Sequence, residues 1–406
     1  MRDDGTMRIL VATTPGLGHL LPMLPLARAA RDRGHEVVIA AGRSLADVAT
    51  AAGFRHEPMG PPSIGSVVDQ VGELVGVTGR RRAVVTLKRV FCEVIAPAMA
   101  DGVSELSDRW RPDVIVHEDR EFGSWVVAER LGVPHVTVQA TAWRPRTAEI
   151  ASDPLNALRH RHGLAGDERL AGLFGRLFLT TRPRSLRDPD APLPEVTAEL
   201  RPIADDRLGA DAAADEDPFP PRDGRPRVAI TLGTVNHDQV AVLRSLIDGA
   251  VAAGAHVVVG LGAEPASLGS VPAGVSVHAY VPMSVLLPVA DLVAFHGGSG
   301  TMLAALAAGT PMIIVPLAAD QPDNADRCLA AGVARVIAPD DLDVDAVARA
   351  VRTVTTDPAY RGRAGEVADE VTAMPGPDVA LDRIESMAAS PAAPNATEPV
   401  APAQGG

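Results

Sequence analysis

The sequence predicts two tandem α/β domains, each built on a doubly wound parallel sheet. The chain has 406 residues, more than one hydrophobic core usually serves. Its apolar content of 46% includes only 3% aromatic residues, as expected for Val/Ile-rich strands and Ala/Leu-rich helices. A strand–helix–strand pattern also opens each half of the chain, and this pattern is typical of parallel sheets covered by helices.

The first domain is expected to span residues 1–205. Apolar runs predict its strands, helical apolar spacing predicts its helices, and Gly34 is a typical helix stop. The expected elements are a strand at 8–13, a turn at 15–18, a helix at 20–33, a strand at 36–41, a strand at 112–117, a helix at 122–131 and a strand at 133–139.

The stretch 182–226 differs in character, with nine prolines and eleven acidic residues. It is predicted to contain no regular core element, to end the first domain and to include a linker at 206–226. The acidic run 211–217 is expected to be its most exposed part.

The second domain is expected at 227–388, followed by an Ala/Pro/Gly-rich tail at 389–406 that is predicted to be disordered. A last helix at 378–387 either ends this domain or crosses back to the first. The other expected elements are a strand at 227–232, a turn at 233–234, a helix at 239–252, and strands at 256–260, 291–296 and 311–316, with a helix at 301–308.

Composition excludes several classes of function. A formal net charge of -13 disfavours binding to nucleic acid or to an anionic membrane. No apolar run reaches about 18 residues without a charge or a breaker, so no membrane span is expected. Residues 1–6 lack the apolar core of a signal peptide, which predicts a cytoplasmic protein. Cys92 and Cys328 are predicted to be ordinary buried thiols.

A glycine-rich turn after the strand 291–296 predicts an anion site. His296 precedes Gly297, Gly298, Ser299 and Gly300, and a helix follows. Backbone amides and the helix dipole favour phosphate at such a helix start. The alternative is a tight turn in which Ser299 or Thr301 only caps the helix.

Asp320 and Gln321 follow the next strand. Their side chains can exchange hydrogen bonds with vicinal sugar hydroxyls, whereas an acidic group among phosphates would be costly. Alternatively, Asp320 or Asp323 caps a helix at 324–331.

The segment 296–332, HGGSGTMLAALAAGTPMIIVPLAADQPDNADRCLAAG, resembles the donor-binding signature of GT-B natural-product glycosyltransferases. Within this superfamily it is most similar to the actinomycete antibiotic and enediyne enzymes that use dTDP-deoxysugars, whose layout the chain follows over 7–388. The resemblance implies two Rossmann-like domains that face each other across a cleft. It also implies a co-substrate, a dTDP-sugar or alternatively a UDP-sugar, with no metal and no cofactor.

The resemblance also implies the roles of single residues in the second domain. The diphosphate would be bound by His296, Gly298, Ser299, Gly300 and Thr301, together with Gly233 and Thr234. The sugar would be bound by Asp320 and Gln321. The nucleotide's base would bind to the turn at Tyr280 and Val281, although Tyr280 could equally be an ordinary half-buried aromatic.

His19 lies on the turn after the first strand, where an imidazole with a near-neutral pKa can accept a proton from an attacking hydroxyl. In the family that the chain resembles, the matching His is the general base; the alternative is a His that only fills the turn. Plant relatives of that family have an Asp as the carboxylate partner of this His. The position that aligns with it here is Glu118, with Asp119 as the second choice, and the alternative is that His19 acts alone; the neighbouring Arg120 is expected to be solvated.

Gly16 and Gly18 on the same turn raise the alternative of a dinucleotide-binding protein. The third glycine of that fingerprint is missing, because Leu21 stands there, and the second strand ends without a ribose-binding acid. NAD binding is therefore not expected.

The acceptor is expected to bind to the loops 61–96 and 143–158, with Gly16, Phe91 and Trp143 as contacts, although Phe91 and Trp143 could equally be core residues. The run 80–82 of three arginines is expected to be a solvated face, or a contact for an acidic acceptor.

The predicted function is an inverting transferase that moves a deoxysugar to a hydroxyl of a hydrophobic secondary metabolite such as a polyketide, macrolide or enediyne. Two alternatives remain: a catalytically silent donor-binding helper protein, and a sugar-nucleotide epimerase or hydrolase of the same fold. The sequence leaves the aglycone, the sugar and the oligomeric state open, a homodimer included.

Overall fold

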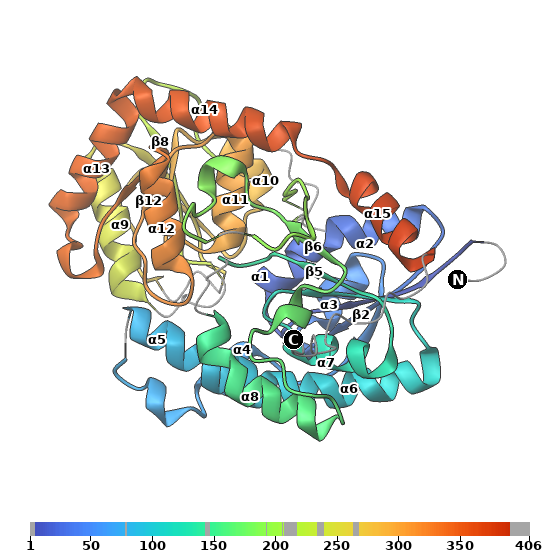
Figure 1. Cartoon of the computed structure of the whole chain (residues 1–406). Helices are drawn as coiled ribbons and strands as arrows, with labels where there is room; N and C mark the ends of the chain where they lie inside the picture. Colours follow the sequence, from blue (N-terminus) through green and yellow to red (C-terminus); the bar gives the residue numbers. More distant parts are fainter. Residues whose placement is uncertain are drawn as a thin grey trace, which may run out of the picture.

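The computed structural model describes residues 5–77, 79–142, 147–191, 193–204, 206, 217–233, 239–262 and 268–389. Within these residues the chain forms two parallel sheets with helices on both faces, seen as two lobes in Figure 1. We call the part with the first sheet the N-terminal domain and the part with the second the C-terminal domain. The α/β prediction is confirmed.

The sheet of the N-terminal domain has the order β3-β2-β1-β4-β5-β6-β7, and every neighbouring pair is parallel. The chain winds in one direction from β1 to β3 and in the other from β4 to β7. The strands are β1 (Arg8–Ala12), β2 (Glu36–Ala41), β3 (Arg55–Pro58), β4 (Val114–Glu118), β5 (His135–Val138), β6 (Leu177–Thr180) and β7 (Thr197–Glu199).

The sheet of the C-terminal domain has the order β10-β9-β8-β11-β12-β13 and is also parallel throughout. It reverses its winding between β8 and β11, as the first sheet does between β1 and β4. The strands are β8 (Arg227–Thr231), β9 (His256–Gly260), β10 (Val275–His278), β11 (Leu292–Phe295), β12 (Met312–Ile314) and β13 (Ala334–Val336).

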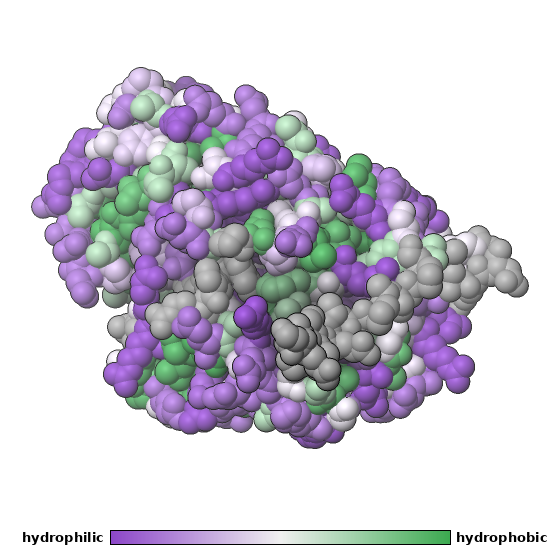
Figure 2. Space-filling view, in the orientation of Figure 1, coloured by the Kyte–Doolittle hydropathy of each residue, from purple (hydrophilic) through white to green (hydrophobic). Residues whose placement is uncertain are grey.

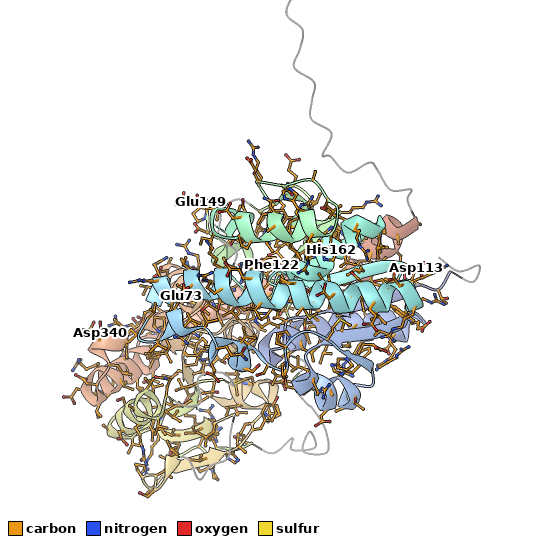
Figure 3. The ribbon with its side chains drawn as sticks, turned by 90° about the horizontal axis from the view of Figure 1, so that it is seen from below. Glu73, Asp113, Phe122, Glu149, His162 and Asp340 are labelled. Atoms are coloured by element: carbon orange, nitrogen blue, oxygen red, sulfur yellow. The ribbon has the colours of Figure 1, made fainter. Side chains whose placement is uncertain are left out.

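Side-chain alternation along each central strand supplies two apolar cores. In β1, Ile9 and Val11 pack on one face with α2 (Leu24–Asp32), while Leu10 and Ala12 pack on the other. The helices of that second face are α6 (Ala96–Trp110), α7 (Phe122–Leu131) and α8 (Thr147–Arg161). Figure 3 shows α6 and the π-helical segment before it (Thr86–Ile95) as one long helix with α8 beside it.

The C-terminal domain repeats this arrangement. Val228 and Ile230 of β8 pack with α9 (Val240–Ala252) and α13 (Val344–Thr356), whereas Ala229 packs with the helices of the opposite face. Those helices are α10 (Met283–Leu286), α11 (Ser299–Ala308), α12 (Gln321–Ala330) and α14 (Pro358–Ala373). The remaining short helices are α1 (Leu17–Leu20), α3 (Ala46–Ala51), α4 (Ile64–Val68) and α5 (Gly79–Val85).

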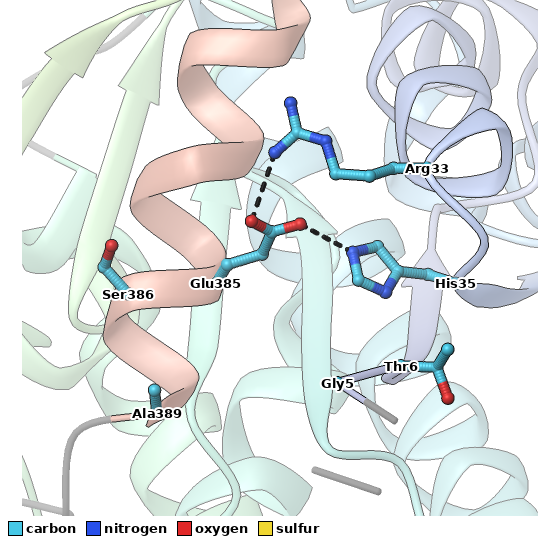
Figure 4. A pocket seen from close by; sticks show the side chains of 7 residues that line it. All are labelled: Gly5, Thr6, Arg33, His35, Glu385, Ser386 and Ala389. Atoms are coloured by element: carbon cyan, nitrogen blue, oxygen red, sulfur yellow. Dashed lines mark hydrogen bonds and ion pairs between the residues drawn. The ribbon is translucent and has the colours of Figure 1, made fainter. Parts of the chain in front are cut away.

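The last helix, α15 (Pro377–Ala389), lies against α2 of the N-terminal domain (Figure 1). Its acidic face holds Arg33, which pairs with Asp378, Asp382 and Glu385. Glu385 also accepts a hydrogen bond from His35 Nε2 at 2.8 Å, as Figure 4 shows. These contacts tie the end of the chain to the domain in which it begins.

One prediction for the proline-rich stretch 182–226 is wrong. Residues 197–199 form β7, the edge strand of the first sheet, and Leu186 and Phe219 are buried in the core of the C-terminal domain. An edge strand pairs on one side only, so it tolerates prolines close by and leaves little periodicity to detect. Of the acidic run, 211–216 lie outside the described residues, as does the tail from 390; Asp217 is exposed.

The face in Figure 2 is mostly hydrophilic with scattered apolar patches. Across the part of the chain that the structure describes, no helix is long and apolar enough to cross a membrane. Cys92 and Cys328 are both unbridged and buried, as predicted, and burial raises the pKa of each thiol, to about 12 for Cys328.

Candidate active site

Loops at the carboxyl ends of the central strands of the N-terminal domain bring His19 and Glu118 together. His19 lies in α1 after β1, and Glu118 is the last residue of β4, which pairs directly with β1. These two strands flank the point where the winding of the sheet reverses, the usual place for a ligand in an open α/β sheet.

His19 Nδ1 lies 3.1 Å from Glu118 Oε1, close enough for an ion pair but without the alignment of a hydrogen bond. The His19 side chain keeps 15% of its surface exposed, while Glu118 is fully buried. Burial lowers the pKa of His19, but Glu118 together with the charges of Asp119 and Asp320 outweighs burial and raises this pKa above its ordinary value. With Nδ1 facing the carboxylate, Nε2 is the atom left for a substrate.

Glu118 is held as an ionised acceptor. Its Oε1 accepts from Thr14 Oγ1 at 2.8 Å and from the Thr14 amide at 3.2 Å, and its Oε2 accepts from the Arg120 amide at 2.6 Å. Burial alone would raise the pKa of Glu118, but the charge of His19 and these hydrogen bonds lower it. The carboxylate is therefore fixed in place before any substrate arrives.

The rest of the loop 117–121 is buried, so the expectation that Arg120 is solvated is wrong. The Arg120 guanidinium donates to Thr141 Oγ1 and to the Ala142 carbonyl, both at 3.0 Å. Asp119 accepts from the amides of Ala140 and Thr141 and does not contact His19. The side chains of Asp119 and Arg120 thus hold the loop that follows β5, and this loop covers the end of β4.

Gly16 and Phe91, two of the predicted acceptor contacts, lie beside His19. A Cβ on Gly16 would lie 2.8 Å from Ile64 Cδ1 and 3.1 Å from His19 Cδ2, so a larger residue here would require these side chains to shift. The Phe91 ring, in the π-helical segment, is partly buried with its centroid 5.9 Å from that of His19. Trp143 lies outside the described residues.

The arginine run is not simply a solvated face. Arg80, on α5, bridges to Asp323 and Asp326 of α12 in the C-terminal domain at 3.2 and 3.0 Å. Arg82 donates to backbone carbonyls of its own loop. The acceptor-side loop thus contacts the opposite domain.

The N-terminus of α11 has no capping side chain. Its cap residue is Gly298, so neither Ser299 nor Thr301 is the N-cap, and Gly300 is exposed with open space where a Cβ would be. Unbonded amides in the first turn of a helix favour an anion.

His296 lies between two glycines beside this helix start. A Cβ on Gly298 would lie 2.5 Å from His296 Nε2, and a Cβ on Gly233 would lie 2.9 Å from His296 Cε1. Burial lowers the pKa of His296 to about 4, so the ring is neutral at pH 7 and can donate a hydrogen bond without carrying charge. Thr234 lies outside the described residues.

Asp320 stands at the start of α12 but does not cap it with its side chain. Its Oδ2 accepts from Ser299 Oγ at 2.6 Å, from Asn324 Nδ2 at 3.2 Å and from the Ala142 amide of the N-terminal domain at 3.1 Å. Gln321 Oε1 accepts from the amides of Leu317 and Ala318, which shapes the loop before it. Asp320 is therefore in contact with the N-terminal domain, and its charge also contributes to the raised pKa of His19.

The turn predicted to bind the base is in contact with the linker. Tyr280 is 43% exposed, and its hydroxyl donates to the Asp206 carbonyl. The Asp206 carboxylate accepts from the amides of Met283 and Ser284 at the start of α10. Val281 is buried in the core, so only its backbone can face a ligand.

No cluster of three or more His, Cys, Asp or Glu side chains within the described ranges is placed to hold a metal ion.

Comparison with known proteins places this geometry in a family. Models of the Erythromycin biosynthesis protein CIII-like family match residues 28–144 with its N-terminal domain and residues 244–387 with its C-terminal domain. L-demethylnoviosyl transferase of Streptomyces niveus is 31% identical over 389 residues, 93% of this chain and 97% of that protein. The chain belongs to the CIII-like family.

Three further proteins that are similar to this chain are glycosyltransferases. Elloramycin glycosyltransferase of Streptomyces olivaceus is 31% identical, over 92% of this chain and 96% of that protein. The glycosyltransferase SnogD of Streptomyces nogalater is similar in structure, with a TM-score of 0.72 and 29% identity over 94% of this chain and 99% of its own. SsfS6 of Streptomyces sp. SF2575, solved with thymidine diphosphate, has a TM-score of 0.76 and 27% identity over 94% of this chain and 99% of its own.

The chain is therefore a glycosyltransferase of antibiotic and other secondary metabolism with the GT-B fold, and the resemblance seen in the sequence is confirmed. The sequence did not reveal Arg182, whose guanidinium reaches Ser299 from the N-terminal domain. No motif marks this arginine, because its partners lie more than 100 positions away in the chain.

Proposed function

We propose that this glycosyltransferase transfers a deoxysugar from a dTDP-sugar to a hydroxyl group of a hydrophobic secondary metabolite, with inversion at the anomeric carbon. The acceptor binds to the N-terminal domain (1–205) and the donor to the C-terminal domain (227–388). The observation that carries the proposal is the His19–Glu118 pair, together with the contacts that Ala142 and Arg182 of the N-terminal domain make with Asp320 and with Ser299 at the start of α11.

In the proposed reaction, His19 Nε2 accepts the proton of the acceptor hydroxyl as its oxygen attacks the anomeric carbon. Glu118 stabilises the imidazolium that forms, because its charge lies against Nδ1. The bond between the anomeric carbon and the diphosphate oxygen breaks on the opposite side, and a single displacement of this kind inverts the configuration.

The leaving diphosphate is proposed to bind to the amides at the start of α11, with neutral His296 as a further donor. Preorganised amides aimed at a developing negative charge stabilise the transition state without reorganisation. We propose that no metal ion is needed for this step. Asp320 and Gln321 are proposed to bind the sugar hydroxyls, and the turn at Tyr280 and Val281 to bind the thymine base. The thymidine diphosphate named in the SsfS6 structure supports the choice of nucleotide.

The test is a transfer assay followed by mass spectrometry, with dTDP- and UDP-deoxysugars as donors and a panel of polyketide, macrolide and enediyne aglycones. The expected result is a glycosylated product of inverted anomeric configuration from the dTDP donor, with a rate that EDTA leaves unchanged. A preference for UDP would overturn the choice of nucleotide. Donor binding without transfer to any acceptor would favour a helper protein, and donor consumption without acceptor would favour an epimerase or hydrolase.

A further inference from the structure

Arg182 is a buried cation that crosses from one domain to the other. It follows β6 of the N-terminal domain, and only 5% of its surface is exposed. Its Nη2 donates to Ser299 Oγ at 2.7 Å, at the first residue of α11, and its Nη1 lies 3.4 Å from Met302 Sδ one turn further on. A buried guanidinium is costly unless an anion and hydrogen bonds compensate it.

The compensating anion is Asp320. Burial would raise the pKa of this carboxyl, but the hydrogen bond from Ser299 and the charge of Arg182 lower it, so the carboxylate stays ionised. For Arg182 the effect of burial has the opposite sign: burial lowers the pKa of the guanidinium, and the charge of Asp320 opposes that shift. The two charges belong to different domains and stabilise each other.

The direction of the hydrogen bonds shows how Arg182 acts on Asp320. A serine hydroxyl has one proton, and Ser299 Oγ donates it to Asp320 Oδ2 at 2.6 Å. The same oxygen can then only accept, which it does from Arg182 Nη2 and from Asn324 Nδ2 at 3.1 Å. Arg182 therefore sets the orientation of the Ser299 hydroxyl, and Ser299 sets the orientation of the carboxylate.

A second contact from the N-terminal domain supports the same carboxylate. The Ala142 amide donates to Asp320 Oδ2 at 3.1 Å, and Ala142 is itself held through its carbonyl by Arg120. Two groups of the opposite domain thus support the orientation of Asp320, Arg182 through Ser299 and Ala142 directly, beside the hydrogen bond from Asn324 of its own domain.

We propose that Arg182 is a positioning residue that orients Asp320 through Ser299 and makes recognition of the donor's sugar depend on contact between the two domains. The proposal rests on the proposed function, which assigns Asp320 to the sugar hydroxyls. It predicts different effects on the two parts of the donor. Loss of Arg182 weakens binding of the sugar but not of the nucleoside diphosphate, because the amides of α11 stay in place.

The test compares Arg182→Met, Arg182→Lys and Ser299→Ala with wild type, using dTDP and a dTDP-deoxysugar in calorimetric titrations without acceptor. The control is Arg184→Met, two residues further on, where the side chain is 78% exposed and pairs with Glu199. We expect Arg182→Met to weaken dTDP-sugar binding by about 10- to 100-fold, the range for a lost charge-assisted hydrogen bond, and to change dTDP binding by less than about threefold.

Arg182→Lys should restore part of the loss, since it keeps the charge without the planar fork. The double variant with Ser299→Ala should lose less than the sum of the single losses, because both act through one chain of hydrogen bonds. Where Arg182→Met lowers thermal stability too far for titration, Arg182→Lys and Ser299→Ala carry the comparison.

Equal losses for dTDP and dTDP-sugar, or no loss for either, would overturn the role of Arg182 while leaving the transferase intact. Additive losses in the double variant would overturn the route through Ser299. Failure of the proposed function would appear in wild type itself, as absence of dTDP-sugar binding and transfer, and would remove both proposals together.

Discussion

Glu118→Gln changes one charge at the centre of the proposed active site, and the structure allows its effects to be worked out. Both carboxylate oxygens accept from backbone amides, Oε1 from Thr14 and Oε2 from Arg120. A glutamine has one acceptor oxygen, so its NH2 group must face one of these N–H groups. One buried donor then lacks its acceptor, and we expect the free energy of unfolding to fall by about 1–3 kcal/mol.

The larger effect should be on the pH dependence of transfer. In wild type the charge of Glu118 raises the pKa of His19 against the effect of burial. The neutral substitute removes that charge, so the pKa of His19 falls and the neutral, basic form persists to lower pH. The acid limb of kcat/KM should move to lower pH, while kcat falls by about 100- to 10,000-fold because His19 loses the anion that stabilises its protonated form.

The assay is kcat/KM for the acceptor, measured from about pH 5 to about pH 9 at saturating donor. Glu121→Gln is the matched control: this carboxylate is buried in the same loop but bonds to the start of α7 rather than to His19. An acid limb that stays in place in Glu118→Gln, or that moves equally in the control, would refute the pairing of His19 with Glu118.

Two further predictions concern packing and stability. Gly298→Ala would place a methyl group 2.5 Å from His296 Nε2, so we expect titration calorimetry to show that dTDP affinity falls by about 5- to 150-fold. The control is Gly362→Ala, where the methyl group meets open space. Unchanged dTDP affinity in Gly298→Ala would contradict the phosphate site. Burial raises the pKa of Glu121 from 4.5 to about 7, so its contribution to stability is full below pH 4.5 and is lost as pH rises through 7. Relative to Glu121→Gln, wild type should therefore lose about 3 kcal/mol of unfolding free energy over this interval in urea titrations, and a pH-independent difference would contradict the shift.

Local sequence signals predicted the framework of the fold. The strand 36–41, the helix 122–131 and the strand 256–260 have the predicted bounds, since each lies between clear breaks in apolar pattern. The helix predicted at 20–33 differs from the observed one. In the structure the helical segment begins at Leu17, and a 3₁₀ turn at Leu21–Met23 divides it into shorter helices. The edge strand β7 was missed because a three-residue strand between prolines has no period to detect.

The candidate site divides in the same way. Its glycine-rich loop and the dipeptide at 320–321 are visible in the sequence because each chemical role lies within a short segment. Arg120 was misjudged, since a run of charged residues looks solvated until the loop after β5 is known to cover it. Arg182 gave no signal because its partner Ser299 is 117 positions away and only domain contact brings them together.

Proton transfer to His19 is the central step of the proposed reaction. The deciding measurement is the single-turnover rate of sugar transfer from a dTDP-deoxysugar by His19→Ala at saturating donor and acceptor. His19 keeps 15% of its side-chain surface exposed and lies in a short helix at the edge of the domain core, so the variant should fold and bind dTDP as wild type does. We expect a rate about 100- to 10,000-fold below that of wild type. A rate equal to that of wild type would contradict this role of His19.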